Sequence, residues 1–105
     1  MDFKKLQEHL RSFADERSWH QFHSPKNLSM ALSVEVAELV EHFQWLTEEQ
    51  SRSPQSVDRS DVAAEIADIQ IYLAMLADKL DVDIEKAVYA KIEANAAKYP
   101  ASGSS

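Results

Sequence analysis

Two pairs of carboxylates have the spacing that places side chains on one face of a helix. Glu35 and Glu38 are three residues apart, and Glu65 and Asp68 repeat this spacing. Side chains three positions apart on a helix are neighbours. Both pairs are flanked by apolar residues that recur at helical intervals, so the carboxylates border the inward stripe of each segment. We therefore expect two helices to bring four carboxylates to the edge of one core.

Four carboxylates that meet in a partly buried place need a partner. They repel one another and lose hydration, and both effects oppose the charged form. Neither residues 34–45 nor residues 61–78 contain a lysine or arginine that would neutralise them. A divalent cation relieves the repulsion near neutral pH, and carboxylate oxygens suit Mg²⁺, with Mn²⁺ as an alternative. The sequence thus predicts a magnesium site made of these four side chains.

Two other interpretations of the acidic residues stay open. A solvated acidic helix face would belong to a non-catalytic helical interaction module. A di-iron or di-manganese redox bundle is the third reading, although such sites use Glu-x-x-His pairs and neither carboxylate pair contains a histidine. Glu41 and His42 follow the first pair closely, and they serve either as outer ligands or as ordinary surface and interior residues.

Four segments have apolar residues at the spacing of amphipathic helices. We expect helices over residues 2–17, 25 to 45 or 46, 58 or 60 to 80, and 83–98. Candidate N-caps are Asp2, Ser24 followed by Pro25, Asp58 or Ser60, and Asp83. The polar segment from residue 47 to residue 57 contains a proline and is expected to be a loop. The predicted fold is all-α and like a four-helix bundle.

Composition limits the class of protein. The chain has 105 residues, so we expect one domain over residues 1–100 with a modest core that oligomerisation completes, and a disordered tail over residues 101–105. A formal net charge of −7 argues against nucleic acid or an anionic membrane as the main partner. The absence of cysteine excludes disulfides and thiolate metal sites. No signal sequence or membrane-spanning run is evident, and a cytoplasmic location is expected.

Four ordered blocks of the sequence resemble the MazG-like, all-α nucleoside triphosphate pyrophosphohydrolases, and within them the dCTP pyrophosphatase branch. The blocks are WHQFHSPKNL at residues 19–28, EVAELVEHFQW at 35–45, EIADIQIYL at 65–73 and KIEANAAKYP at 91–100. The resemblance implies Mg²⁺-dependent hydrolysis of a nucleoside triphosphate, with dCTP or a modified dCTP as the leading substrate, to the monophosphate and pyrophosphate. It also implies a housecleaning role in the nucleotide pool, and sites shared between the subunits of a homodimer or homotetramer.

The resemblance assigns roles to single residues. The implied metal ligands are Glu35, Glu38, Glu65 and Asp68, and Glu38 is the first candidate for orienting the attacking water, with Glu35 as the alternative. The implied base-binding residues are Trp19, Trp45, Tyr72 and Asn95. Aromatic faces stack on a nucleobase, and an amide reads its hydrogen-bonding edge, so these residue types suit the role.

The phosphate contacts follow from the same resemblance. Lys91 and Lys98 match basic positions that contact the phosphates, and His23 is a candidate contact to phosphate or water. The chain departs from the family pattern in one place, because Leu10 stands where related dCTP pyrophosphatases carry a histidine. His9 beside it points about 100° away around the helix, so the base and sugar preference is left open.

Overall fold

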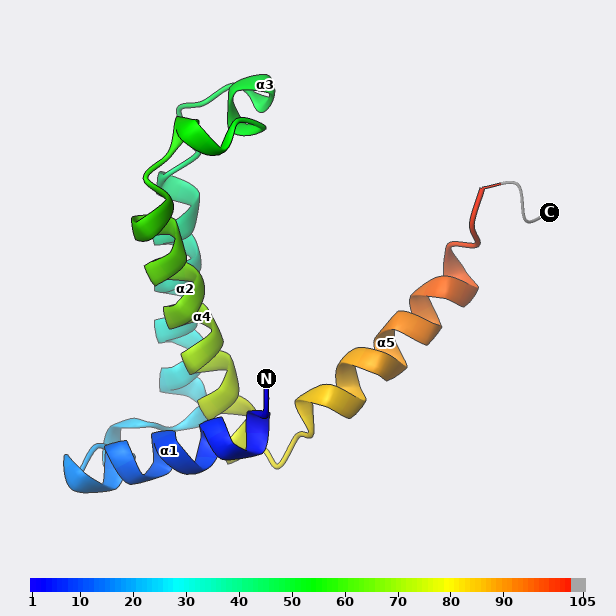
Figure 1. The fold of residues 1–105 in the computed structure, drawn as a ribbon. Helices are drawn as coiled ribbons and strands as arrows, with labels where there is room; N and C mark the ends of the chain where they lie inside the picture. The colour runs from blue at the N-terminus through cyan, green and yellow to red at the C-terminus, as the bar shows by residue number, and fades with distance from the viewer. Residues whose placement is uncertain (103–105) are drawn as a thin grey trace.

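The computed structural model describes residues 1–102 of the chain, and every regular element in that part is helical (Figure 1). The four long helices are α1 (Phe3–Glu16), α2 (Pro25–Glu41), α4 (Arg59–Lys79) and α5 (Ile84–Lys98). The short elements are the 3-10 turns η1 (His20–Phe22) and η2 (Pro54–Ser56) and the single-turn helix α3 (Glu48–Ser51). None of the described helices has the length and apolar composition needed to cross a membrane. The predicted all-α class is confirmed.

The helices α2 and α4 form an antiparallel pair at the centre of the structure (Figure 1). The segment with α3 and η2 connects them at one end of the pair. The helix α1 lies across the other end and packs on α4. This antiparallel arrangement is the one that allows carboxylates from α2 and α4 to face each other.

The predicted N-caps are all present. The side chains of Asp2, Ser24, Asp58 and Asp83 each accept a hydrogen bond from a backbone N–H in the first turn of the helix that follows. Asp58 rather than Ser60 is the cap of α4, and Pro25 takes the first helical position of α2. These side chains satisfy N–H groups that have no partner within the helix, and they define where each helix begins.

One predicted boundary is wrong, and one short helix was not predicted. The helix α2 ends at Glu41, four or five residues before the expected end, because the backbone hydrogen bonds then shift to the three-residue spacing of turns, as from Phe43 N to Val40 O at 2.9 Å. The expected loop contains the helix α3, which a capping box stabilises: Thr47 N donates to Gln50 Oε1 at 2.9 Å and Gln50 N donates to Thr47 Oγ1 at 3.1 Å.

The buried core of the chain is small. It consists of Leu28 and of three alanines, Ala14, Ala74 and Ala77, which allow α1 to approach α4 closely. A hydrogen bond from Gln7 Nε2 to the Ala74 carbonyl oxygen, 3.0 Å long, adds a polar link between these two helices. Leu28, at the start of α2, is the largest fully buried side chain described. The position of α2 therefore depends strongly on this one leucine.

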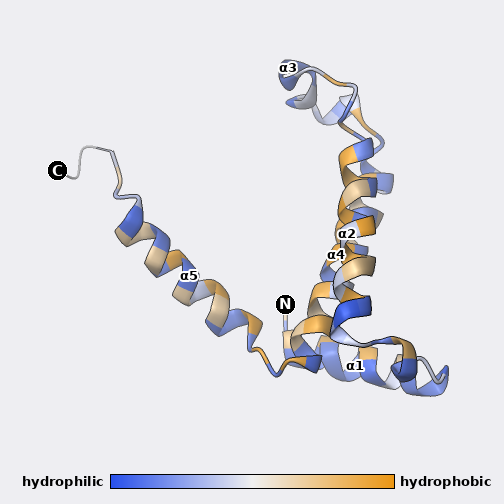
Figure 2. Cartoon of the chain, turned by 180° about the vertical axis from the view of Figure 1, so that it is seen from behind, coloured by the Kyte–Doolittle hydropathy of each residue, from blue (hydrophilic) through white to orange (hydrophobic). Residues whose placement is uncertain are grey.

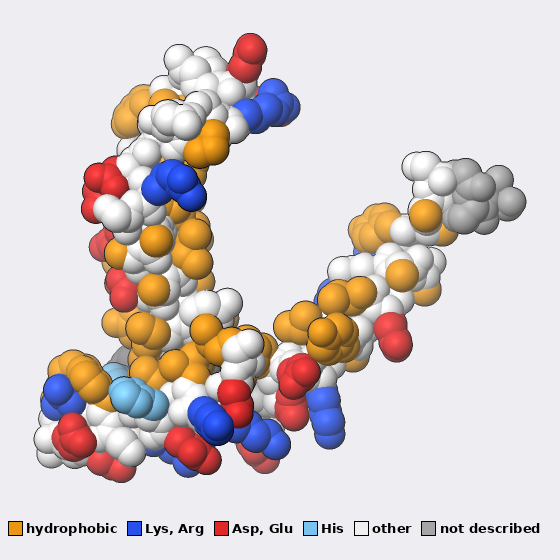
Figure 3. Space-filling model, in the orientation of Figure 1, with side chains coloured by type: hydrophobic (Ala, Val, Ile, Leu, Met, Phe, Trp, Pro, Cys, Tyr) orange, Lys and Arg blue, Asp and Glu red, His pale blue; other side chains and the backbone are white. Residues whose placement is uncertain are grey.

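The helix α5 extends away from the other helices (Figures 1 and 3). Val88, Tyr89 and Ile92 are all about half exposed or more, and the hydropathy colouring shows apolar residues along α5 as well as along α2 and α4 (Figure 2). Apolar side chains of α5 are therefore left uncovered in the single chain. The predicted tail lies largely outside the described residues, because residues 103–105 are not described.

Replacing Leu28 by alanine is expected to lower the free energy of unfolding by about 2–5 kcal/mol, since it removes a large side chain that is only 1% exposed. Chemical denaturation followed by circular dichroism measures this loss. Met30→Ala is the matched control, because Met30 lies on the same helix and is 57% exposed. Equal losses in the two variants would contradict the assignment of Leu28 as the core of the structure.

Candidate active site

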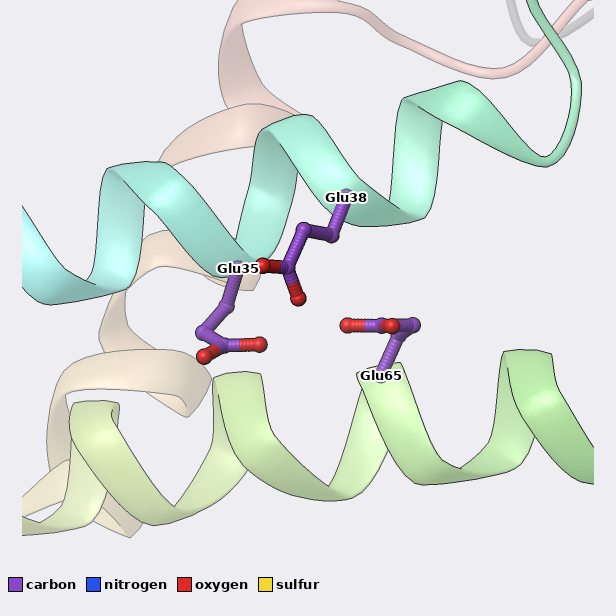
Figure 4. A group of neighbouring side chains, drawn as sticks. All are labelled: Glu35, Glu38 and Glu65. Atoms are coloured by element: carbon purple, nitrogen blue, oxygen red, sulfur yellow. The ribbon is translucent and has the colours of Figure 1, made fainter.

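Three of the four predicted metal ligands converge between the two central helices. Glu35 and Glu38 come from α2 and Glu65 comes from α4, and their side chains point toward one another (Figure 4). One carboxylate oxygen from each residue lies within 4.8 Å of the other two. All three side chains are half-buried. The convergence that the helical spacing predicted is therefore present for these three residues, which we call the carboxylate cluster.

The carboxylate cluster is electrostatically unsatisfied. Glu35 Oε2 and Glu65 Oε2 are buried and have no hydrogen-bond partner among residues 1–102. Burial is the largest of the effects that together raise the pKa of Glu35 to about 7, and the neighbouring carboxylates Glu38, Asp68 and Glu65 supply the rest. A proton or a cation is thus required for this arrangement to be stable near neutral pH.

The protein offers the cluster little positive charge of its own. Within residues 1–102, its only ion pair joins Glu65 Oε1 to His42 Nε2 at 3.9 Å, and no lysine or arginine pairs with it. Two orphaned oxygens and a donor set made entirely of carboxylates fit a hard divalent cation such as Mg²⁺ or Mn²⁺. The residues present therefore fit the predicted metal.

Asp68, the fourth predicted ligand, lies beside the cluster rather than within it. Its side chain is exposed, yet its charge still raises the pKa of Glu35. It also lines a groove with a volume of about 400 Å³ that runs along α1, α4 and the turn between α1 and α2. Asp68 thus lines this groove and also influences the charge of the neighbouring carboxylate cluster.

The groove combines apolar walls with a few polar groups. Its lining includes Leu6, Leu10, Phe13, Trp19, His23 and Tyr72. The rings of Phe13 and Trp19 meet edge to face with centroids 5.5 Å apart, and those of Trp19 and His23 meet at 6.1 Å. A pocket of this composition suits a flat, partly polar ring, and it opens next to the carboxylates. We call it the aromatic groove.

His23 gives the aromatic groove a neutral hydrogen-bonding group. Its pKa is lowered, first by burial and then by the nearby side chains of Lys79 and His20. Near neutral pH its imidazole therefore carries no charge, and it has one nitrogen that donates and one that accepts. This protonation state suits recognition of a base edge or a water better than ion pairing with a phosphate.

Four of the predicted substrate-binding residues are not brought to this site by the single chain. Trp45 is 87% exposed in the turn that follows α2. Lys91, Asn95 and Lys98 lie on the exposed helix α5, and Lys91 lines a different groove, between α4 and α5. Trp19, His23 and Tyr72 by contrast share the aromatic groove.

Sequence reasoning also missed residues that shape the site. Leu6 and Phe13 have no predicted role in the site, yet they form a groove wall together with Leu10. Both Leu10 and the neighbouring His9 line the groove, although adjacent residues were expected to face different directions. Helical spacing of Leu6, Leu10 and Phe13 indicated a shared face, but only the fold shows that this face meets Tyr72.

Comparison with known proteins assigns the chain to a family. The MazG-like family model matches residues 30–105. The chain belongs to the MazG-like family. This confirms the resemblance to the family that the four sequence blocks predicted. The matched residues include the segments that carry the carboxylate cluster.

Named relatives point in the same direction. The chain is 46% identical over 92 residues to dCTP pyrophosphatase 1 of Bos taurus, covering 84% of this chain and 53% of that protein. It is 45% identical over 93 residues to dCTP pyrophosphatase 1 of Homo sapiens, covering 85% of this chain and 54% of that protein. The chain thus spans about half the length of these curated relatives. The crystal structure of a pyrophosphatase from Archaeoglobus fulgidus superposes with a TM-score of 0.86 at 39% identity, covering 96% of this chain and 94% of that one.

The raised pKa of Glu35 predicts how stability depends on pH in the metal-free protein. The folded state keeps a proton that the unfolded state loses between pH 4.5 and about 7. The stabilising contribution is therefore complete below pH 4.5 and is lost as the pH rises through about 7. Glu35→Gln should abolish this dependence, so that in EDTA the variant melts at a higher temperature than the wild type at about pH 8 but not at about pH 4.5.

Thermal melts across this pH range test the prediction. Glu41→Gln is the matched control, since Glu41 is an exposed carboxylate on the same helix and is outside the carboxylate cluster. An unchanged pH profile in the Glu35 variant would mean that the cluster does not hold a shared proton.

Proposed function

We propose that the chain hydrolyses nucleoside triphosphates, with dCTP or a base-modified dCTP as its substrate, to the monophosphate and pyrophosphate. The observation that carries the proposal is the half-buried carboxylate cluster, with two orphaned oxygens, beside an aromatic groove that shares Asp68 with it. Membership of the MazG-like family and similarity to proteins named dCTP pyrophosphatase support the choice of reaction and substrate. In the cytoplasm this activity would remove excess or noncanonical nucleotides.

The carboxylates would hold the metal that the reaction requires. Glu35, Glu38 and Glu65 are the ligands that the fold brings together, and Asp68 is the proposed fourth. Mg²⁺, when bound, neutralises charge on the triphosphate and makes its phosphorus more susceptible to attack. Because Asp68 also lines the aromatic groove, a nucleotide whose base lies in the groove has its phosphates directed toward the cluster.

Glu38 is the proposed residue that orients the attacking water. Glu35 and Glu65 each have a buried carboxylate oxygen without a hydrogen-bond partner among the described residues, which suits them to hold the metal, and Glu38 is therefore assigned to the water. It would accept the proton as the water oxygen bonds to the α-phosphorus and the bond from that phosphorus to the bridging oxygen breaks. Pyrophosphate then leaves. Glu35 is the alternative for this role.

The aromatic groove would bind the base. Trp19 and Tyr72 offer faces for stacking, and neutral His23 offers a donor and an acceptor to the edge of the ring. Most of the remaining lining is apolar, with His9 and Asp68 as the exceptions, and these apolar side chains would shield the faces of the base from water. These contacts are the same before and during the reaction, so they contribute affinity rather than rate.

The proposal is tested by measuring pyrophosphate release from canonical and modified deoxynucleoside and ribonucleoside triphosphates in the presence of Mg²⁺. We expect turnover that is highest for dCTP or a 5-substituted dCTP and that stops in EDTA. Glu38→Gln and Asp68→Asn should each lower kcat/KM by at least about 100-fold while the protein stays folded, since they remove groups that act on charge in the transition state.

Glu41→Gln serves as the control for loss of a carboxylate outside the cluster. No release from any substrate would reject the enzyme and would favour a non-catalytic helical module, especially if Mg²⁺ also left the melting temperature unchanged. Full activity in the Glu38 or Asp68 variant would remove the proposed site. Bound iron with a visible spectrum would indicate a redox bundle instead.

We also propose that the protein acts as a homodimer or homotetramer. In the single chain α5 exposes the apolar side chains of Val88 and Ile92. Apolar side chains left exposed together on one helix mark an interaction site. The proposed substrate residues Lys91, Asn95 and Lys98 lie on the same helix, away from the aromatic groove. A second copy that covers α5 would bring such residues to a site, where the two lysines support departure of pyrophosphate and Asn95 reads the base.

A charged residue on this face is expected to dissociate the assembly. Val88→Glu should shift the sedimentation coefficient of the protein toward that of a monomer and should lower pyrophosphate release in parallel. The matched control is Glu85→Gln, a change in charge in the first turn of the same helix. A wild type that sediments as a monomer at micromolar concentration would contradict the proposal.

A further inference from the structure

The turn between α1 and α2 carries Trp19 and His23, so its position determines one wall of the aromatic groove. The turn is held to its own two helices. Ser18 adopts a left-handed conformation with φ of 54°, Trp19 N donates to the Ala14 carbonyl at 3.0 Å, and Asn27 Nδ2 donates to the Phe22 carbonyl at 3.0 Å. None of these bonds reaches α4, which supplies Tyr72 to the groove.

His20 makes the polar contact between this turn and α4. Its Nε2 lies 2.7 Å from Asp15 Oδ1 on α1, and its Nδ1 lies 3.2 Å from Lys79 Nζ on α4. An ammonium group can only donate, so Nδ1 is the acceptor and Nε2 carries the proton that Asp15 accepts. One imidazole thus joins α1, the turn and α4 through both of its ring nitrogens.

The other polar contacts between α1 and α4 do not involve the turn. Arg11 Nε lies 2.9 Å from Asp78 Oδ2, and Gln7 Nε2 donates to the Ala74 carbonyl at 3.0 Å. Both hold the body of α1 on α4 and would survive the loss of His20. The contact made by His20 is therefore the one that sets how far the turn lies from α4.

We propose that His20 is a positioning residue that holds Trp19 and His23 at the distance from Tyr72 that a nucleobase requires. His20 is not part of the groove lining. It lies behind the groove, where it lines a small cavity with His23 and Lys79. The inference rests on the proposed function, because it assigns the aromatic groove to the base of the substrate.

The loss of His20 should affect binding and not the chemical step. The carboxylate cluster is built from α2 and α4, and neither helix is positioned by His20 against the other. A looser groove wall weakens contacts that are equal in the ground and transition states, which raises KM and leaves kcat unchanged. Because the contact is partly exposed, the rise should be roughly three- to tenfold.

The experiment compares His20→Ala with His20→Gln. A glutamine amide has one group that donates and one that accepts, so it can reproduce the contacts to both Asp15 and Lys79. Steady-state kinetics with dCTP and Mg²⁺ give KM and kcat in the otherwise unchanged protein. Acrylamide quenching of Trp19 fluorescence, with nucleotide absent, reports the position of the turn in a Trp45→Phe background that leaves Trp19 as the single tryptophan.

We expect His20→Ala to raise both KM and the quenching of Trp19, with kcat within about twofold of the wild type, and His20→Gln to restore both values. Gln21→Ala is the matched control, because Gln21 is on the same turn and, within the described part of the chain, its side chain bonds only to the Ser18 carbonyl. This control should leave KM and quenching unchanged.

Three results would overturn the inference: wild-type KM and quenching in His20→Ala, a fall in kcat in place of a rise in KM, or a glutamine variant that behaves like the alanine variant. A wild type that does not hydrolyse dCTP rejects the proposed function instead. The quenching comparison then still decides whether His20 holds the turn.

Discussion

The structure depends on a conflict between like charges. Glu35, Glu38 and Glu65 are held within 4.8 Å of one another, half-buried, with no lysine or arginine paired to them in the described chain. Two of their oxygens have no partner, and the pKa of Glu35 rises to about 7 in response, first through burial. Such a cluster costs stability unless a cation or proton relieves it, so its retention favours a functional explanation over a purely structural one.

The rest of the fold supports this cluster and connects it to a binding surface. The antiparallel pair of α2 and α4 sets the distance between the carboxylates, and α1 packs on α4 through alanines so that its apolar face forms a wall of the aromatic groove. Asp68 joins the two regions. A site for charged phosphates thus lies next to a site for a flat ring, which matches the two halves of a nucleotide.

The accuracy of the sequence-based predictions depended on the range of the interaction. Caps such as Ser24 and Asp83 were found correctly because they bond to backbone groups within three residues. The end of α2 was predicted too late, because the apolar spacing continues through Phe43 while the backbone hydrogen bonds there already follow a turn. The helix α3 was missed because Pro54 and a polar composition outweighed the capping box of Thr47 and Gln50.

The sequence by itself determined the four long helices, the pairing of the carboxylates on two of them and, through four ordered blocks, the family, since periodicity and short motifs are local properties of the chain. Only the tertiary structure decided that Asp68 lies beside the cluster, that Leu10 and Tyr72 line one groove and that His20 reaches Lys79, 59 residues away. It also left α5 uncovered, so Lys91 and Asn95 remain distant from the groove within one chain. These features depend on helix crossings and packing, which no local pattern encodes.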